Sequence, residues 1–341
     1  MHFRVQTDEI NYGLGMVTRA IAARPAKQVY DGVLIETDEN ALLLTCTDGE
    51  ITIKARVNAM VEEEGCALLP AKLFAEMMRK QPVGEVDIKV GDTMRAAIRS
   101  RGTNSSMACM PAEDYPEIRD VNGDYHLQLP CNRFRDAISR VQFAVSNDES
   151  RKILTGILME AHREETLLVG LDGFRLALQR IEAENDLGTK TQLNTVVPGR
   201  TLNEVSKMLP DSDENAAFTL GSKHILFQMG SATLICRLLE GEFLDWRRVV
   251  PTNCPVKLTA HVSDLASSIE RVGLIVSEKY KSPIRCVFSN QVLNMRTNTT
   301  IGAAEDRCAI AGDGKELEIG FNVRYMADAL RAVPCEEVTL E

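Results

Sequence analysis

Two aspartates occupy matching places in the sequence, and paired carboxylates are the residues that acid–base hydrolysis requires. Asp48 and Asp172 are each followed by glycine and lie 124 residues apart. Apolar runs flank each Asp-Gly pair, and this pattern is typical of a β-hairpin turn. Because the pair recurs at the spacing of an internal repeat, we interpret both aspartates as turn residues.

The other residues that could do chemistry form no recognisable centre. The five histidines lack HxxxH and HExxH spacing, and the nine cysteines are scattered without a CxxC pair. This argues against a metal site, a nucleophilic site and a disulfide framework, and it favours a reducing cytoplasm. No GxGxxG or Walker pattern occurs, so we expect no nucleotide and no other cofactor. A hydrolase that uses Asp48, Asp172 and a histidine remains an alternative, which an assay with and without divalent metal would test.

Length and composition predict a globular protein of several domains. The chain has 341 residues, of which 44% are hydrophobic and 26% are charged. No apolar run reaches 18 residues, and the N-terminus lacks the pattern of a signal peptide, so membrane-spanning and secreted proteins are excluded. The net charge of -10 argues against nucleic-acid binding unless the charges are segregated.

Internal repetition divides the chain into three copies of one unit. Each copy opens with a short strand and continues with apolar residues at the +4 and +3 spacing of one helix face. These residues are Ile10, Leu14 and Val17, then Phe134, Ile138 and Val141, then Leu265, Ile269 and Val272. A second helix is predicted in the segments that begin at Leu68, Val196 and Ile319, with Pro70 and Pro198 near the helix starts. Each copy is therefore expected to be an α+β domain with the element order β-α-β-β-β-α-β-β-β.

The repeat predicts three domains, over residues 1–125, 126–253 and 254–341. The third copy stops in the strand after its second helix, where the other two copies continue with a strand pair. By repeat arithmetic, roughly 25 residues of C-terminal strands and tail are missing from it.

The predicted helical segments carry more positive charge than the rest of the chain. Together they hold +7, which leaves -17 elsewhere; the segments are 8–27, 70–80, 130–143, 198–209, 262–281 and 321–332. Such segregation attracts a polyanion to one surface, although ordinary solvated helix faces are the alternative. No zinc-finger, basic-zipper or RNP pattern is present, so the composition permits contact with a nucleic-acid backbone that is independent of base sequence.

Four segments carry a resemblance to a known family: LDGFRLAL at 171–178, LLEGEFLDWRRVVP at 238–251, SEKYKSPIR at 277–285 and EIGFNVRYMADAL at 318–330. Together with the three tandem copies, they resemble the bacterial DNA polymerase III β subunit, the sliding clamp, over the whole chain. The resemblance implies two-helix, β-rich clamp domains and a head-to-tail homodimer that closes a ring around duplex DNA. It implies a non-catalytic processivity factor in the cytoplasm, which tethers the replicative polymerase without sequence specificity.

The resemblance also implies partners and a peptide pocket. The partners are double-stranded DNA, a second copy of the chain, the polymerase catalytic subunit, the clamp loader, and other replication and repair proteins that bind through short peptides. The pocket is assigned to Leu154, Leu171, Gly173, Phe174, Arg175, Leu176, Leu244, Arg248 and Val249. Phe174 stands where the family can have histidine and Leu244 where it can have proline, so we expect a pocket of altered shape.

Two further residue sets follow from the helices and the resemblance. The DNA-facing set is Arg24, Lys72, Arg79, Arg133, Arg140, Arg151, Lys152 and Arg200. Leu274 and Ile275 are assigned to the dimer interface, opposite residues 103–107 of the first domain, where Ser105 replaces a frequent aromatic residue. A scaffold that binds peptides but not DNA is the alternative, and binding to circular and linear DNA would distinguish the two.

Overall fold

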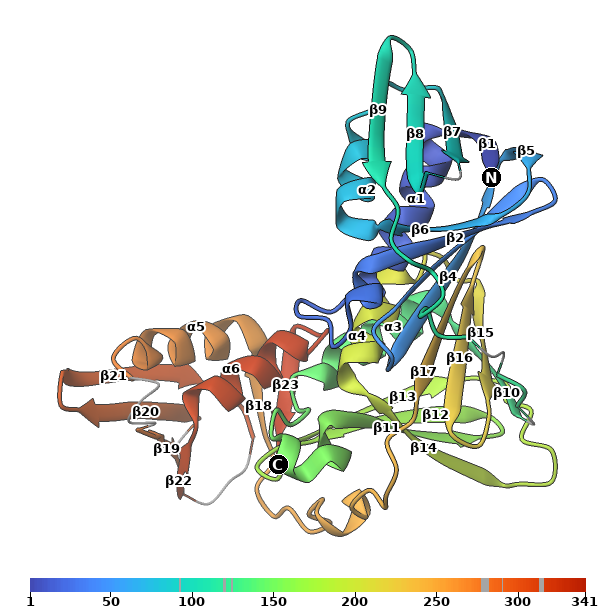
Figure 1. The fold of residues 1–341 in the computed structure, drawn as a ribbon. Helices are drawn as coiled ribbons and strands as arrows, with labels where there is room; N and C mark the ends of the chain where they lie inside the picture. The colour runs from blue at the N-terminus through green and yellow to red at the C-terminus, as the bar shows by residue number, and fades with distance from the viewer. Residues whose placement is uncertain (92, 119–120, 124, 277–281, 290, 313–315) are drawn as a thin grey trace. The chain divides into compact units, whose positions relative to one another are not determined.

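The computed structural model describes residues 1–341 except 92, 119–120, 124, 277–281, 290 and 313–315 (Figure 1). Residues 277–281 of the SEKYKSPIR segment therefore lie outside the described residues. The chain forms two compact units, one of residues 1–138, 148–168 and 180–241, the other of residues 139–147, 169–179 and 242–341. Among the residues described, no helix combines the length and the apolar character needed to span a bilayer.

The first sequence copy places its apolar stripe on one buried helix face. Its elements are β1 (His2–Gln6), α1 (Thr7–Val17), η1 (Thr18–Ala20), η2 (Gln28–Asp31), β2 (Gly32–Asp38), β3 (Ala41–Thr47), β4 (Ile51–Asn58), β5 (Met60–Glu63), β6 (Cys66–Pro70), α2 (Ala71–Arg79), β7 (Glu85–Gly91), β8 (Arg95–Ser100) and β9 (Thr103–Ala108). The predicted stripe on α1 is confirmed, because its three apolar residues are buried. Helix α1 lies so close to the sheet that a Cβ at Gly13 would overlap Val57 of β4.

The second copy repeats this order with one strand fewer between its two helices. Its elements are β10 (Tyr125–Pro130), α3 (Cys131–Gln142), η3 (Glu149–Thr155), β11 (Gly156–His162), β12 (Glu165–Leu171), β13 (Leu176–Glu182), β14 (Gln192–Pro198), α4 (Gly199–Met208), β15 (Asn215–Leu220), β16 (His224–Met229) and β17 (Ala232–Arg237). The stripe on α3 is buried, as predicted. A short helix, η4 (Trp246–Arg248), lies in the connection to the third copy.

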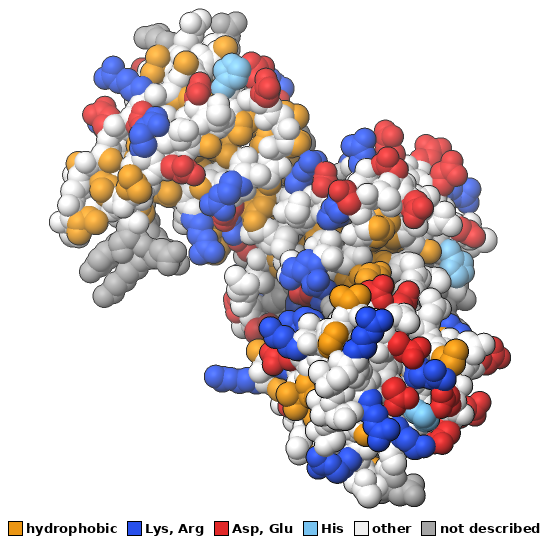
Figure 2. Space-filling view, turned by 90° about the horizontal axis from the view of Figure 1, so that it is seen from above, with side chains coloured by type: hydrophobic (Ala, Val, Ile, Leu, Met, Phe, Trp, Pro, Cys, Tyr) orange, Lys and Arg blue, Asp and Glu red, His pale blue; other side chains and the backbone are white. Residues whose placement is uncertain are grey.

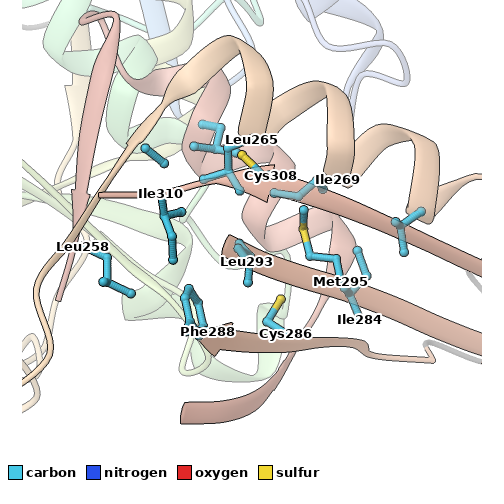
Figure 3. Packing of buried hydrophobic residues seen from close by; sticks show 13 residues of the cluster. Leu258, Leu265, Ile269, Ile284, Cys286, Phe288, Leu293, Met295, Cys308 and Ile310 are labelled. Carbon is cyan, nitrogen blue, oxygen red and sulfur yellow. The ribbon is translucent and has the colours of Figure 1, made fainter. Parts of the chain in front are cut away.

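The third copy has its own core, which Figure 3 shows. Its elements are β18 (Leu258–His261), α5 (Val262–Gly273), β19 (Ile284–Ser289), β20 (Val292–Thr299), β21 (Gly302–Ala309), β22 (Leu317–Phe321), α6 (Val323–Ala332) and β23 (Glu337–Leu340). Leu265 and Ile269 of α5 pack against Cys286, Leu293 and other buried residues of the strands. Burial raises the pKa of the Cys286 thiol to about 11, so it remains protonated within this core.

The second helix of each copy begins close to its predicted start, and the apolar run before it forms an additional strand. Leu68, Val196 and Ile319 lie in strands β6, β14 and β22, and the helices start three or four residues later, at Ala71, Gly199 and Val323. The preceding apolar runs pair with neighbouring strands, and each copy therefore has more strands between its helices than predicted. Pro70 and Pro198 are the N-cap residues of α2 and α4, as expected near helix starts. In α6 the side chain of Asn322 takes this place and accepts the Arg324 N–H at 2.9 Å.

Strand order repeats between the copies. One four-stranded arrangement occurs three times, as β4-β3-β2-β6, β13-β12-β11-β14 and β21-β20-β19-β22. The other occurs as β1-β7-β8-β9, to which β5 adds a fifth strand beside β1, and as β10-β15-β16-β17. The pair β18-β23 begins this arrangement in the third copy. Antiparallel pairing of β17 with β4 joins the first two copies into one eight-stranded sheet. Strands β9 and β21, which correspond to β17 and β4, are edge strands of their sheets among the described residues.

Candidate functional site

The two Asp-Gly pairs form hairpin turns of one design, which confirms their interpretation as turn residues. The Asp172 Oδ1 atom accepts hydrogen bonds from the backbone N–H groups of Phe174 and Arg175 at 2.8 and 3.0 Å. The Asp48 Oδ1 atom accepts from the second and third following residues in the same way, at 3.0 and 2.9 Å. Gly173 and Gly49 have φ of 94° and 93°, a conformation that favours glycine. Both carboxylates therefore stabilise the backbone of a turn, and we assign them no catalytic role.

Arg175 connects the second turn to helix α6. Its Nε atom donates to Asp172 Oδ2 at 3.0 Å and its Nη1 atom to Asp328 Oδ2 at 2.7 Å. The guanidinium carbon lies 4.3 Å from the centroid of the Tyr325 ring and 5.3 Å from that of Phe143. The side chains of Arg175 and Asp328 are only 16% and 12% exposed. Because its donors already bind carboxylates, Arg175 holds the turn in place.

Phe174 stands at the tip of the same turn and is 80% exposed. Its ring centroid lies 6.4 Å from that of Tyr325, with the two rings tilted by 34°. A large, exposed aromatic residue that lies next to a second aromatic ring is typical of an interaction surface. Tyr325 and Asp328 were not among the predicted site residues. The quoted segment at 318–330 contains both, and it was the only signal in the sequence.

The connection after the second copy presents further apolar side chains. Trp246 is buried, and Arg247 stacks on it with its guanidinium carbon 4.3 Å from the ring centroid. Leu244 and Val249 on either side are each about half exposed. The Arg248 Nε atom lies 3.0 Å from Asp245 Oδ2, and the Arg248 side chain is 86% exposed. Trp246 thus anchors a segment whose flanking apolar residues face solvent.

The remaining predicted pocket residues differ in exposure. Leu171 and Leu154 are buried, and Leu176 is half-buried. Leu154 belongs to the first compact unit, whereas the other predicted pocket residues belong to the second. Within the second unit, one turn brings together Gly173, Phe174 and Arg175. That all nine residues form one pocket stays a prediction.

The residues predicted to face DNA lie in three kinds of position. Lys72, Arg79 and Arg133 are exposed on α2 and α3, and Arg140 of α3 is half-buried. Arg151 and Lys152 are exposed in η3. Arg24 lies between η1 and η2 rather than on a helix, so that placement was wrong.

Two other arginines are placed by specific contacts. The Arg200 Nη1 atom, at the start of α4, lies 2.7 Å from Asp48 Oδ2. Arg331 of α6, which the sequence did not single out, lines a cavity of about 350 Å³ together with Arg140, Phe143 and Asp328.

The charge of the helices is smaller than predicted. The six α-helices among the described residues hold ten basic and eight acidic side chains, a net charge of +2. Helix α1 ends at Val17, so Arg19, Arg24 and Lys27 follow it instead of lying on it. Figure 2 shows basic and acidic side chains interspersed over the face in view. The basic excess therefore extends into the loops that follow the helices.

The two residues assigned to the dimer interface follow the end of α5. Leu274 directly follows α5 and is 83% exposed, whereas Ile275 is half-buried. At the other predicted surface, β8 and β9 line a hollow of about 590 Å³ that includes Ser105. Ser105 is the cross-strand partner of the buried Ile98, so its side chain lies on the other face of the sheet from Ala97 and Arg99. These assignments stay predictions.

Comparisons with known proteins give the same family for every part of the chain that they match. Family models of the DNA polymerase III beta subunit match residues 1–119 (N-terminal domain), 128–245 (central domain) and 247–341 (C-terminal domain). The beta sliding clamp of Staphylococcus epidermidis is 29% identical over 351 residues, which cover 100% of this chain and 92% of that protein.

Solved structures show the same fold. A putative DNA polymerase III beta subunit from Eubacterium rectale superposes with a TM-score of 0.95 at 28% identity, covering 99% of this chain and 92% of that one. The DNA polymerase sliding clamp of Pseudomonas aeruginosa, solved with a ligand, gives a TM-score of 0.94 at 27% identity with the same coverage. Since three family models together match nearly all of its residues, the chain belongs to the DNA polymerase III beta subunit family, the sliding clamps.

Proposed function

We propose that two copies of this chain join head to tail into a ring that encircles duplex DNA and holds a polymerase on it. Family membership makes the chain a DNA sliding clamp, a processivity factor and not an enzyme. A ring of this kind cannot leave DNA sideways, so it keeps a bound polymerase at a high effective concentration near the template. The proposal therefore concerns how this chain forms the ring and which residues meet its partners.

The repeated strand order carries the proposal of a head-to-tail dimer. Within the chain, β17 of the second copy pairs with β4 of the first copy. The corresponding strands β9 and β21 are edge strands of separate sheets among the described residues. Unpaired strand edges are templates for pairing with another chain. If β9 of one copy paired with β21 of another, the intermolecular junction would repeat the β17–β4 junction.

Contact with DNA is proposed through the basic residues on and after the helices. Lys72, Arg79 and Arg133 are exposed on successive helices, and Arg24 lies in the basic segment after α1. Side chains of this kind bind phosphate without reading bases, which permits sliding and makes binding sensitive to salt. Arg151 and Lys152 in η3 complete the proposed contact.

The partner site is proposed at the turn around Phe174 and the segment around Trp246. An exposed aromatic side chain with two half-exposed aliphatic residues suits the apolar anchors of a short extended peptide. We assign the polymerase catalytic subunit to this site. The clamp loader and other replication and repair proteins would use the same site, in the cytoplasm.

Charged substitutions at the proposed junction test the ring. Leu274→Asp with Ile275→Asp should place two carboxylates in the interface and give monomers of 37.8 kDa by light scattering, in place of a dimer of twice that mass. The matched control, Met60→Asp with Val61→Asp, changes one exposed and one half-buried residue of β5. Strand β5 is the edge strand opposite β9 in the five-stranded sheet of the first copy. This control should keep the dimer and its retention on circular DNA. An unchanged mass in the first variant would contradict the assignment.

Binding of a polymerase C-terminal peptide tests the partner site. Leu176→Ser with Arg248→Ala should abolish peptide binding, measured by calorimetry, because it removes an apolar contact and an exposed cation. The control is Leu317→Ser with Arg285→Ala, an exposed apolar and basic pair on other strands of the second unit. Retained binding in the first variant, or binding lost only together with the thermal transition, would overturn the assignment.

A further inference from the structure

A cleft of about 600 Å³ opens in the first compact unit, whereas Phe174 and Trp246 of the proposed partner site belong to the second. Its lining comes from η2, the first hairpin turn with the ends of β3 and β4, the connection after β9, the turn between β15 and β16, and strand β17. The lining includes Ile118, Val121, Lys223, His224, Ile235 and Arg237. Its volume falls in the range of ligand-binding pockets.

The internal repeat relates this cleft to the proposed partner site. Gly49 and Glu50 lie in the first hairpin turn, where Gly173 and Phe174 lie in the second, 124 residues later. The connection that lines the cleft follows β9, as the segment around Trp246 follows β17. The cleft therefore combines the same two kinds of element, a glycine turn and the connection to the next copy.

Apolar and charged groups line different parts of the cleft. Ile118 and Val121 of the connection and Ile235 of β17 supply aliphatic surface. Lys223 and His224 are adjacent in sequence, and His224 is the cross-strand partner of Arg237, so three basic groups lie together. All three are exposed.

Acidic groups also surround these basic residues. Glu240 accepts a hydrogen bond from Arg237 at 2.8 Å, and both Arg237 and Lys223 lower the pKa of its carboxyl. Glu50 is adjacent to Arg237 through a backbone hydrogen bond of 3.3 Å, and Glu117 lies on the connection. The rim therefore presents both signs of charge around an aliphatic interior.

We propose that this cleft is a second peptide-binding site of the clamp, which takes a short extended segment with an apolar anchor between one acidic and one basic residue. The anchor contacts Ile118, Val121 and Ile235, and the basic residue meets Glu117. The acidic residue meets the basic cluster of Lys223, His224 and Arg237. Charge complementarity of this kind selects partners more than it adds affinity. The choice of a peptide as the occupant rests on the proposed function of the repeat-related site.

The test removes the first site so that the second can be measured alone. The probe is a fluorescein-labelled, end-capped peptide with the core Asp-Leu-Phe-Leu-Lys, and its neutral twin has the core Asn-Leu-Phe-Leu-Gln. The full-length protein carries Leu176→Ser with Arg248→Ala. We expect saturable binding of the charged probe by anisotropy, at least fivefold tighter than that of the neutral twin.

Charge reversal then locates the binding. Adding Lys223→Glu and Arg237→Glu should weaken binding of the charged probe at least tenfold, whereas Arg163→Glu with Lys190→Glu, two exposed basic residues elsewhere in the same unit, should leave it unchanged. Methyl spectra should show shifts at Ile118 and Ile235. Absence of saturable binding, or binding indifferent to the Lys223 and Arg237 changes, would overturn the second site.

The first site is tested separately, by the loss of polymerase peptide binding in Leu176→Ser with Arg248→Ala. The ring is tested by the mass of the dimer. Failure of either of those measurements would contradict the proposed function without deciding the second site.

Discussion

The hairpin turns at Asp48 and Asp172 have the same backbone but different anchors. In both, one carboxylate oxygen accepts two backbone N–H groups across a glycine of positive φ. The second oxygen of Asp48 meets Arg200 of α4, whose side chain is 48% exposed. The second oxygen of Asp172 meets Arg175 of its own turn, which continues to Asp328 of α6. The turn sequence thus sets the local backbone, and the following copy supplies the anchor.

The residue after each glycine shows how the two copies have diverged. The first turn presents Glu50 and the second presents Phe174, and both side chains are exposed. One scaffold therefore displays a carboxylate at one junction and an aromatic ring at the other. Because the backbone is shared, this difference in surface chemistry requires no difference in fold, which is how a repeat can serve partners of different composition.

The largest expected effect comes from breaking the anchor of the second turn. Asp328→Asn removes the charge that faces the partly buried Arg175 and should lower the free energy of unfolding by about 2 kcal/mol. Denaturant unfolding measures this. The control, Asp245→Asn, affects an ion pair with the exposed Arg248 and should produce no measurable change. Equal effects of the two substitutions would contradict the role of Asp328 as an anchor.

A smaller and equal effect is expected from the two glycines. Gly49→Ala and Gly173→Ala each force alanine into a left-handed conformation, at a cost of about 1 kcal/mol. At Gly49 the new methyl group would lie 3.3 Å from the Tyr30 hydroxyl, but this is the far end of a half-buried side chain, which can shift by a few tenths of an ångström. Thermal unfolding of the two variants should therefore show similar shifts. A large loss at only one glycine would mean that the two turns are not equivalent.

The sequence predicted features that depend on local pattern. Apolar stripes located the helices, and the Asp-Gly pairs located the turns, because hairpin geometry is encoded within a few residues. The strands before the second helices were missed, because a short apolar run next to a helix cannot be recognised as a strand by its periodicity alone. The contact of Arg175 with Asp328 spans 153 residues and gave no local signal. The proximity of the Phe174 and Tyr325 rings likewise joins distant segments and gave no local signal.

The smallest effect is expected at Arg200, where the anchor of the first turn and the proposed DNA surface coincide. Arg200→Gln removes a half-exposed partner of Asp48 and should lower the free energy of unfolding by less than about 1 kcal/mol, and by less still at high salt. Because Asp48 already engages its guanidinium, Arg200→Gln should weaken DNA binding less than Arg79→Gln does on α2. Filter binding across a salt series would compare the two variants, and both should lose affinity equally for every DNA sequence. A greater loss for Arg200→Gln than for Arg79→Gln would mean that Arg200 leaves Asp48 to bind phosphate, and that the first turn has no fixed anchor when DNA is bound.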